Sequence, residues 1–449
     1  MARAPANVDD FLEAMRRHLP RFVSDYVQGG AGDELCMARN REDLDALTLY
    51  PRVLRDTTTL DTGVEVFGSC WRRPFAIAPT GLNGLVRPGG DVSLAVSAAA
   101  EGIPFTLSTA SNVRLEAIRA AVPEGEQWMQ LYVMQDRRIA SQLIARAAGC
   151  GYRALVLTVD VPVSGLRLRD VRNGFGLPLR MTPRLLMDLL AHPRWTLGMA
   201  RSGTPAFPNL TANPDGGGLD GGGLDGGGAA SSLAPQAQAA LLAREMDRTL
   251  DWRCIDWLRS LWTGPLLLKG ILHPDDALRA VDCGIDGLIV SNHGGRQLEA
   301  APSAIGALKG VVNTVPAGFP VFMDSGIRSG TDVAKALALG ARAVFVGRPA
   351  LYGLAVGGVS GIRAVLRLLG DDLERNMALL GVRCIGEFGA VRHDHRHWSS
   401  GATGDGNAEP VLEGGHMKQP AHISDARPPE RAVLCRPALH EVLDPRSVP

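Results

Sequence analysis

Eight short apolar runs recur along the chain, and this repetition constrains the fold more than any other feature of the sequence. The runs cover residues 74–80, 104–109, 128–133, 154–160, 265–270, 287–291, 320–326 and 343–347. Most are separated by Ala- and Leu-rich stretches of helical period, such as 91–101, 139–148, 274–281 and 331–339. Strands that alternate with helices form parallel sheets, and eight such units make a TIM barrel. We therefore expect an α/β fold, a (β/α)8 barrel.

Polar residues or glycine end each of these runs. In a TIM barrel the carboxyl ends of all eight strands face one mouth, where active sites lie. The residues predicted at this mouth are Thr80, Ser108, Gln130, Tyr132, Thr158, Asp160, Lys269, His293, Asp324, Gly347 and Arg348. Because all eight strand ends share this character, the sequence predicts a functional site there.

The segment 291–299, directly after the sixth run, carries the most informative motif. His293 has the side chain best suited to accept a proton near neutral pH, and Arg296 can bind a carboxylate through two parallel hydrogen bonds. Gly294 and Gly295 allow a sharp turn between them. Alone, the motif fits a structural His with a solvated Arg equally well. The polar ends of the other strands favour the catalytic interpretation.

A phosphate site is predicted after the seventh and eighth strands, the usual phosphate position of this fold. Small residues in 324–330 and 346–349 expose backbone N–H groups, and Arg328 and Arg348 can add charge-assisted hydrogen bonds. The alternative is a pair of ordinary turns with solvated arginines. No G-x-G-x-x-G motif follows a strand, so nothing indicates a Rossmann dinucleotide site.

Composition narrows the class of protein. The 449 residues carry a formal net charge of zero, which argues against a nucleic-acid partner. The seven cysteines include no CxxC pair and suit free thiols in a reducing compartment. The N-terminus is polar, and no apolar run reaches the roughly 18 residues of a membrane-spanning helix. We expect a cytoplasmic protein whose residues 8–49 are mainly helical.

Two segments depart from the barrel pattern. A long insert, 176–238, begins with a basic and apolar stretch and continues into the glycine-rich tract 216–228. The first part could lie on a membrane surface or form a buried lid helix. We expect one barrel domain over 1–390 and a disordered polar tail over 391–449. His393, His395 and His397 could bind a metal, but a solvated tail is far more common, and no metal site is predicted.

The motif in 291–299 is highly specific, and residues 25–380 as a whole resemble the FMN-dependent α-hydroxy-acid dehydrogenases and oxidases. Stretches 78–84, 107–112 and 244–247 are most similar to the mandelate-oxidising members. The resemblance implies an FMN across the barrel mouth, with Lys269 facing flavin N1 and O2, where the reduced ring carries negative charge. The implied cofactor-binding residues are Ala78, Pro79, Thr80, Ser108, Gln130, Thr158, Lys269, Ser291, Asp324, Gly326, Arg328, Gly347 and Arg348.

The resemblance also assigns the substrate site. Arg167 and Arg296 would hold the substrate carboxylate, and Tyr26 and Tyr132 would hydrogen-bond the carboxylate and hydroxyl. His293 would be the base, whether it takes the α-proton or the hydroxyl proton, and Asp160 would stabilise the imidazolium. Gly81 would leave room for a ring on the substrate. Leu166 stands where many relatives have a second Arg, and neither the glycine-rich insert nor the tail resembles the family.

The predicted reaction is the oxidation of a mandelate-like (S)-2-hydroxy acid to the 2-oxo acid, with a quinone or another acceptor taking the electrons. The alternatives are an L-lactate dehydrogenase or oxidase of the same family, and a non-redox barrel that binds a phosphorylated ligand. The resemblance implies a homo-oligomer, a tetramer. The insert suggests peripheral attachment to the inner face of the cytoplasmic membrane.

Overall fold

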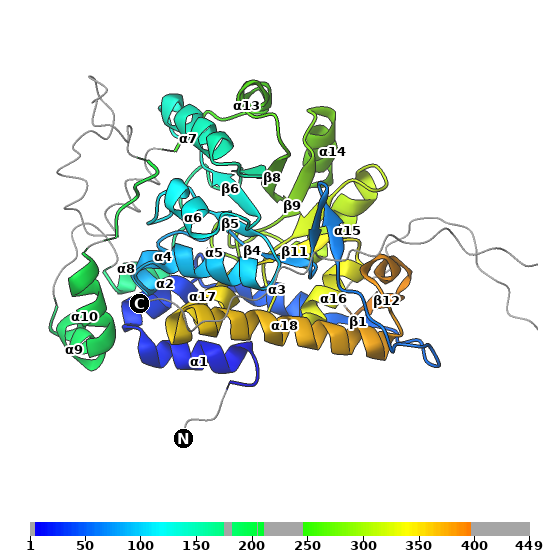
Figure 1. Cartoon of the computed structure of the whole chain (residues 1–449), viewed down its shortest axis with the longest axis horizontal. Coiled ribbons are helices and arrows are strands. Elements are labelled where there is room, and N and C mark those ends of the chain that lie inside the picture. Colours follow the sequence, from blue (N-terminus) through cyan, green and yellow to red (C-terminus); the bar gives the residue numbers. More distant parts are fainter. Residues whose placement is uncertain (1–4, 175–181, 204, 211–245, 397–449) are drawn as a thin grey trace, which may run out of the picture. The chain divides into compact units, whose positions relative to one another are not determined.

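The computed structural model describes residues 5–174, 182–203, 205–210 and 246–396, and it contains a closed barrel of eight parallel strands (Figure 1). The strands follow one another around the barrel in sequence order. They are β4 (Phe75–Ile77), β5 (Phe105–Leu107), β6 (Gln127–Leu131), β7 (Ala154–Thr158), β8 (Leu266–Ile271), β9 (Gly287–Val290), β10 (Val321–Met323) and β11 (Ala343–Val346). Each lies within one predicted apolar run or within a residue of it, so the predicted (β/α)8 fold is confirmed.

Helices cover the outside of the barrel, as the alternating pattern predicts. They are α4 (Asn83–Val86), α5 (Gly90–Ala100), α6 (Leu115–Ala121), α7 (Arg137–Gly149), α8 (Leu168–Arg172), α13 (Cys254–Leu261), α14 (Pro274–Asp282), α15 (Ala304–Thr314), α16 (Gly330–Ala338), α17 (Arg348–Gly357) and α18 (Val359–Leu380). The strands are almost wholly buried because helices lie outside them and the barrel core lies inside.

Aromatic side chains fill the amino-terminal end of the barrel. Trp71 and Trp128 meet edge to face with ring centroids 5.5 Å apart, and Phe322 packs against both. Trp71 comes from a small hairpin of β2 (Val64–Val66) and β3 (Ser69–Trp71), which Arg342 fastens to the start of β11 through a hydrogen bond to Glu65 O. Since this end is packed solid, a ligand must enter at the carboxyl ends of the strands.

The N-terminal segment forms three helices and one strand. The helices α1 (Val8–His18), α2 (Arg21–Gln28) and α3 (Leu35–Ala46) confirm the prediction for this segment, and α1 packs along α17 and α18 (Figure 1). Residues 47–49 differ, because they form β1 (Leu47–Leu49), which pairs antiparallel with β12 (His393–His395). The pairing buries Leu47 on one face.

The predicted disordered tail therefore begins with an ordered strand. His395 pairs with Leu47 in register, is buried, and its Nε2 lies 3.0 Å from Asp43 O on α3. The His395 imidazole packs in the core and contacts a backbone oxygen. The sequence pattern of the tail could not reveal this, because it gave His395 no partner that would distinguish it from a solvated residue. The chain separates into two units, Met1–His395 and Arg396–Pro449, and His397 lies outside the described residues.

The first part of the insert forms two exposed helices, α9 (Pro183–Ala191) and α10 (Pro193–Ser202). Thr182 caps α9, and neither helix has a buried residue, which contradicts the buried-lid alternative. Asp188 accepts a hydrogen bond from Arg21 N, and Trp195 donates to Leu85 O. These contacts anchor the helix pair to α2 and α4 while leaving its outer face free. The glycine-rich tract 216–228 lies outside the described residues.

Candidate active site

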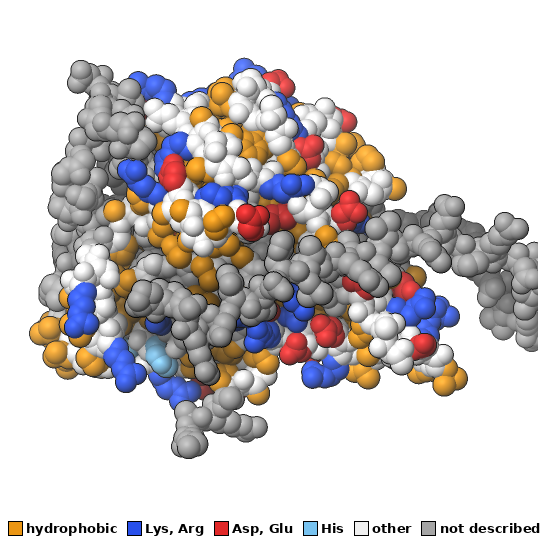
Figure 2. Space-filling view, in the orientation of Figure 1, with side chains coloured by type: hydrophobic (Ala, Val, Ile, Leu, Met, Phe, Trp, Pro, Cys, Tyr) orange, Lys and Arg blue, Asp and Glu red, His pale blue; other side chains and the backbone are white. Residues whose placement is uncertain are grey.

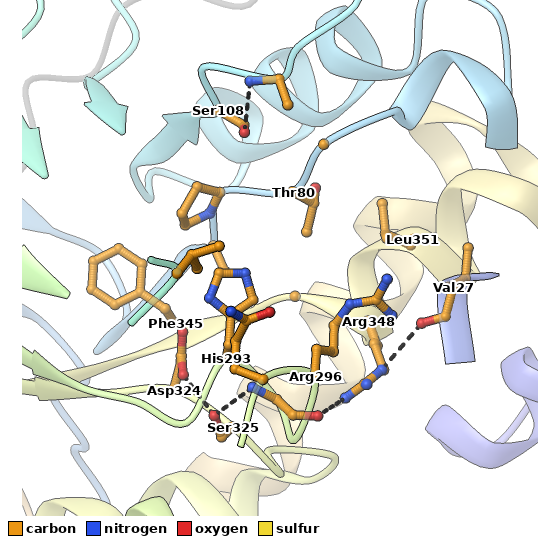
Figure 3. A pocket seen from close by; sticks show the side chains of 18 of the residues that line it. Val27, Thr80, Ser108, His293, Arg296, Asp324, Ser325, Phe345, Arg348 and Leu351 are labelled. Atoms are coloured by element: carbon orange, nitrogen blue, oxygen red, sulfur yellow. Dashed lines mark hydrogen bonds between the residues drawn. The ribbon is translucent and has the colours of Figure 1, made fainter. Parts of the chain in front are cut away.

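One cavity opens at the carboxyl ends of the strands and gathers most of the predicted site residues (Figure 3). The predicted residues that line it are Tyr26, Ala78, Pro79, Thr80, Gly81, Ser108, Tyr132, Arg167, Lys269, His293, Arg296, Asp324, Gly326, Arg328, Gly347 and Arg348. The remaining four, Gln130, Thr158, Asp160 and Ser291, lie directly behind the lining, as their hydrogen bonds show. Residues from all eight strand ends thus meet at one site.

His293 lies between an acidic and a phenolic partner. Its Nδ1 is 3.1 Å from Asp160 Oδ1, and its Nε2 is 3.5 Å from the Tyr132 hydroxyl. A carboxylate at Nδ1 holds the imidazole in the tautomer whose Nε2 is a free acceptor. This nitrogen faces the cavity with Tyr132 beside it.

Electrostatics keep Asp160 ionised. Burial alone would raise the pKa of its carboxyl, but His293 and, after it, Lys269 hold that pKa below its ordinary value. The pKa of Tyr132 is raised by burial and by the charge of Asp160, so the phenol stays protonated at neutral pH. The site therefore contains a carboxylate that stabilises a cation at His293 and a hydroxyl that can donate a hydrogen bond.

The backbone that carries His293 is strained. His293 has φ of 58°, in the left-handed region that non-glycine residues seldom adopt, and its N–H donates to Ser291 Oγ at 3.0 Å. Gly294 and Gly295 follow with φ of 66° and 75°. A Cβ on Gly295 would lie 2.7 Å from Met37 N, so this turn requires glycine. Together these positive φ angles turn the imidazole toward the cavity.

Two arginines lie together on one wall. The guanidinium carbons of Arg296 and Arg167 lie 5.1 and 5.8 Å from the centre of the Tyr26 ring. Arg296 Nη1 donates to Tyr26 O and Gly29 O, each at 2.8 Å, which fixes the fork. Burial and the charge of Arg167 lower the pKa of Arg296. A carboxylate in the cavity would offset this repulsion.

A second positive region lies after β10 and β11, at the predicted phosphate position. Arg348 is held by backbone oxygens of Val27, Gly29 and Gly294 at 2.8–3.1 Å (Figure 3). Burial and the charge of Arg296 lower its pKa. Arg328 lies over the Tyr352 ring at 5.9 Å. Arginines that line a cavity and form no ion pair with a carboxylate of the described residues favour an anionic ligand such as a phosphate.

Lys269 is the cation at the centre of the barrel mouth. Its Nζ lies 2.8 Å from Asp324 Oδ2 and donates to Ser291 Oγ at 2.8 Å. Burial lowers the pKa of Lys269, but Asp324 and Asp160 more than offset this and raise it, so the side chain is charged. Three of the predicted cofactor-binding residues, Lys269, Asp324 and Ser291, therefore contact one another.

The neighbouring amide network orders the adjacent wall. Gln130 Oε1 accepts from Ser108 Oγ at 3.2 Å, and Gln130 Nε2 donates to Thr158 Oγ1 at 3.0 Å. The Thr80 hydroxyl is buried at the cavity edge and has no hydrogen-bond partner among the described residues. An unsatisfied buried hydroxyl is costly, and a polar ring system bound in the cavity would satisfy it. The polar side chains of this wall fit FMN, and so do the cation of Lys269 and the phosphate position lined by arginines.

Several residues of the site escaped the sequence reasoning. Phe207 from the insert and Met246 from the segment after it line the cavity, as does Ala110 beside Gly81. Gln297 donates to Asp160 O and Val163 O and so ties the β7 loop to the β9 loop. Gln297 lies inside the 291–299 motif, and Ala110 and Met246 lie inside the family-like stretches 107–112 and 244–247, so each carried a signal that could have marked it. Phe207 carried none and reaches the cavity through tertiary contacts.

The sequence matches the family of FMN-dependent dehydrogenases over residues 15–393. The chain belongs to this family and is an FMN-dependent hydroxy-acid oxidoreductase. It is 42% identical to (S)-mandelate dehydrogenase of Pseudomonas putida over 84% of this chain and 90% of that protein. It is 41% identical to L-lactate dehydrogenase of Caulobacter vibrioides over 84% of this chain and 94% of that protein.

Solved structures agree with the sequence relatives. A crystal structure of (S)-mandelate dehydrogenase, described as a monotopic membrane protein, matches with a TM-score of 0.78 and 41% identity, over 86% of this chain and 98% of that one. A mutant mandelate oxidase with (S)-mandelic acid matches with a TM-score of 0.71 and 35% identity, over 87% and 99%. The family and the cofactor predicted from the sequence are confirmed.

Proposed function

We propose that the protein oxidises (S)-2-hydroxy acids that carry a bulky, aromatic substituent, such as mandelate, to the 2-oxo acids. The small pair Gly81 and Ala110 at the cavity wall carries this proposal. A Cβ built on Gly81 would lie 2.9 Å from the Ala110 Cβ, so these two residues meet with almost no side chain between them. Together with the apolar Phe207 and Met246, they form an apolar part of the cavity lining, which suits a ring.

The site residues take the roles that their geometry suits. Arg167 and Arg296 bind the substrate carboxylate, and the hydroxyls of Tyr26 and Tyr132 hydrogen-bond to the substrate. His293 Nε2 accepts a proton from the substrate, and the Asp160 carboxylate stabilises the imidazolium so formed.

Bound FMN would supply the acceptor for the two electrons of the oxidation. Its ring would lie against residues 78–80, Ser108, Gln130, Thr158 and Lys269, with Ser291 behind that lysine. Its phosphate and ribityl chain would lie against Asp324, Gly326, Arg328, Gly347 and Arg348. Arg328 and Arg348 at the cavity wall, and the Thr80 hydroxyl, which has no hydrogen-bond partner among the described residues, support this assignment.

Substrate preference is tested by anaerobic bleaching of the flavin. With (S)-mandelate and L-lactate compared at equal concentration, we expect a higher kcat/KM for mandelate. Lactate is the natural competitor, because the chain is 41% identical to an L-lactate dehydrogenase and 42% identical to (S)-mandelate dehydrogenase. A preference for lactate of tenfold or more, which is about 1.4 kcal/mol, would contradict the proposal.

We also propose that α9 and α10 attach the enzyme to the inner face of the cytoplasmic membrane, where a quinone takes the electrons. Leu186, Met187, Leu190 and Leu197 are between 50% and 71% exposed, and Arg184, Arg194 and Arg201 lie among them. Figure 2 shows hydrophobic and basic side chains intermixed at this corner, over the helices labelled in Figure 1. Apolar side chains flanked by Arg suit an anionic lipid surface. No helix in the described ranges is long and apolar enough to cross a bilayer.

Vesicle sedimentation tests this attachment. The protein should bind phosphatidylglycerol vesicles, and a Leu186→Ser, Leu190→Ser double variant should lose most of that binding. Leu379→Ser is the matched control, because Leu379 is 68% exposed on α18. Equal loss in the control, or none in the double variant, would exclude attachment through α9 and α10. We also propose that the protein forms the homotetramer implied by the family resemblance. Light scattering, which gives the molecular mass in solution, tests this oligomeric state.

A further inference from the structure

Asp91 is a buried carboxyl group that the roles proposed above do not use. It lies in the first turn of α5 and has no exposed surface. Its hydrogen bonds come from Asn83 Nδ2 at 2.7 Å, from Asn112 N at 3.1 Å and from the Ser111 side chain. No Lys or Arg of the described part of the chain forms an ion pair with it. Burying a carboxyl group without a cation is costly, so its position calls for an explanation.

Its first link runs to the cofactor side of the cavity. Asn83 Nδ2 donates both to Asp91 Oδ1 at 2.7 Å and to Thr80 O at 2.9 Å. Because a carboxylate only accepts hydrogen bonds, it forces the amide nitrogen of Asn83 toward Thr80. Asn83 Oδ1 is buried and has no partner among the described residues. The amide is thus held in an orientation that leaves its own oxygen unsatisfied, and a buried unsatisfied oxygen of this kind calls for an explanation.

Its second link runs to the insert. Asn112, whose N–H donates to Asp91, accepts from Gly84 N at 2.9 Å through Oδ1 and donates to Ala206 O at 2.8 Å through Nδ2. Ala206 directly precedes Phe207, which lines the cavity. The segment of the insert that carries Phe207 is therefore linked to the same carboxylate as the loop that carries Thr80 and Gly81.

We propose that Asp91 is a positioning residue that sets the distance between two walls of the active site. Through Asn83 it holds Thr80 and Gly81, which face the cofactor and the substrate. Through Asn112 it holds Phe207, the aromatic wall contributed by the insert. The substrate part of this inference rests on the proposed preference for bulky hydroxy acids, whereas the cofactor part does not.

Asp91→Asn tests the proposal, because it turns one hydrogen-bond acceptor into a donor that faces the existing donors. The substitution leaves the volume of the side chain almost unchanged. We expect kcat/KM for (S)-mandelate to fall at least tenfold more than kcat/KM for L-lactate, mainly through KM. We also expect the dissociation constant of FMN from the apoprotein, measured by flavin fluorescence, to rise at least fivefold. Glu101→Gln is the matched control, since Glu101 is a buried acid at the other end of α5 that pairs with Arg363 and Arg367.

Two further variants separate the links. Asn112→Ala should change the mandelate to lactate ratio and spare FMN binding, whereas Asn83→Ala should weaken FMN binding first. These variants decide the matter if Asp91→Asn does not fold. Equal behaviour of Asp91→Asn and Glu101→Gln in both measurements would overturn the proposal. A wild type that does not favour mandelate would refute the proposed substrate instead, and the FMN dissociation constant would still decide on Asp91.

Discussion

His293 Nδ1 lies 3.1 Å from Asp160 Oδ1, and the two residues come from the ends of β9 and β7, on either side of β8. This contact leaves His293 Nε2 to face the cavity. The imidazole can therefore take a substrate proton while its other nitrogen donates to a carboxylate that stays ionised.

Asp160→Asn should slow flavin reduction by about 10²- to 10⁴-fold, because an amide no longer fixes the tautomer or stabilises the imidazolium. Stopped-flow absorbance under anaerobic conditions measures the rate. Binding of a non-reactive carboxylate should change little, since Arg167 and Arg296 remain. A variant whose reduction rate stays within threefold of the wild type would refute this role for Asp160.

Arg296→Lys should raise KM for the hydroxy acid while leaving FMN bound. Arg296 uses Nη1 for Tyr26 O and Gly29 O, and the rest of its planar fork can bind a carboxylate. A lysine ammonium cannot reproduce both functions, and we expect a loss of about 10- to 100-fold in kcat/KM, which corresponds to the about 1.5–3 kcal/mol of a hydrogen bond to a charged group. If the wild type oxidised the acid and its methyl ester equally well, a carboxylate clamp would be excluded.

Gly81→Ala should reduce kcat/KM for mandelate more than for lactate. The new Cβ would lie 2.9 Å from the Ala110 Cβ, so residue 81 or the Ala110 loop must move, which reshapes the cavity wall that both residues line. One methyl group in a pocket changes discrimination by about 1–3 kcal/mol. The double variant with Ala110→Gly relieves the contact between the two residues. An unchanged mandelate to lactate ratio in Gly81→Ala would show that this wall does not select the substrate.

The pH dependence of stability should carry a contribution from Asp91. Burial raises its pKa from 3.8 to about 6 in the folded state. Between these two values the folded chain binds the proton more strongly than the unfolded chain, so this contribution to the free energy of unfolding falls as pH rises from about 4 to about 6. The full shift corresponds to about 3 kcal/mol. Denaturant titrations between about pH 4 and pH 6 should show that the free energy of unfolding falls less steeply with pH in Asp91→Asn than in the wild type. An identical pH dependence in the two proteins would contradict the assignment.

The barrel could be predicted because buried parallel strands are short apolar runs, and each run here stands between helical stretches. The mouth residues followed from the same pattern, since every strand ends at the same rim. The pairing of β1 with β12 could not be predicted, because Thr48 and Asp394 are 346 positions apart in the chain. Strands of three residues are also too short to show a hydrophobic period.

The walls contributed by Phe207 and Met246 were not predicted, for another reason. Phe207 is held at the cavity through the hydrogen bond from Asn112 Nδ2 to Ala206 O, and Met246 through its bridge to Met134 beside β6. Neither contact could be read from a local pattern, although Met246 lies in the family-like stretch 244–247. Asp91 likewise resembles an ordinary acidic residue in the first turn of a helix until its buried partners are known.

The central claim is that His293 is the base of an FMN-dependent hydroxy-acid oxidation, and His293→Ala tests it most directly. The variant should bind FMN with wild-type absorbance, because Lys269 and the phosphate position are untouched. On anaerobic mixing with (S)-mandelate its flavin should bleach at least about 10²- to 10⁴-fold more slowly than the wild type. Bleaching of the variant at a near wild-type rate would contradict the account.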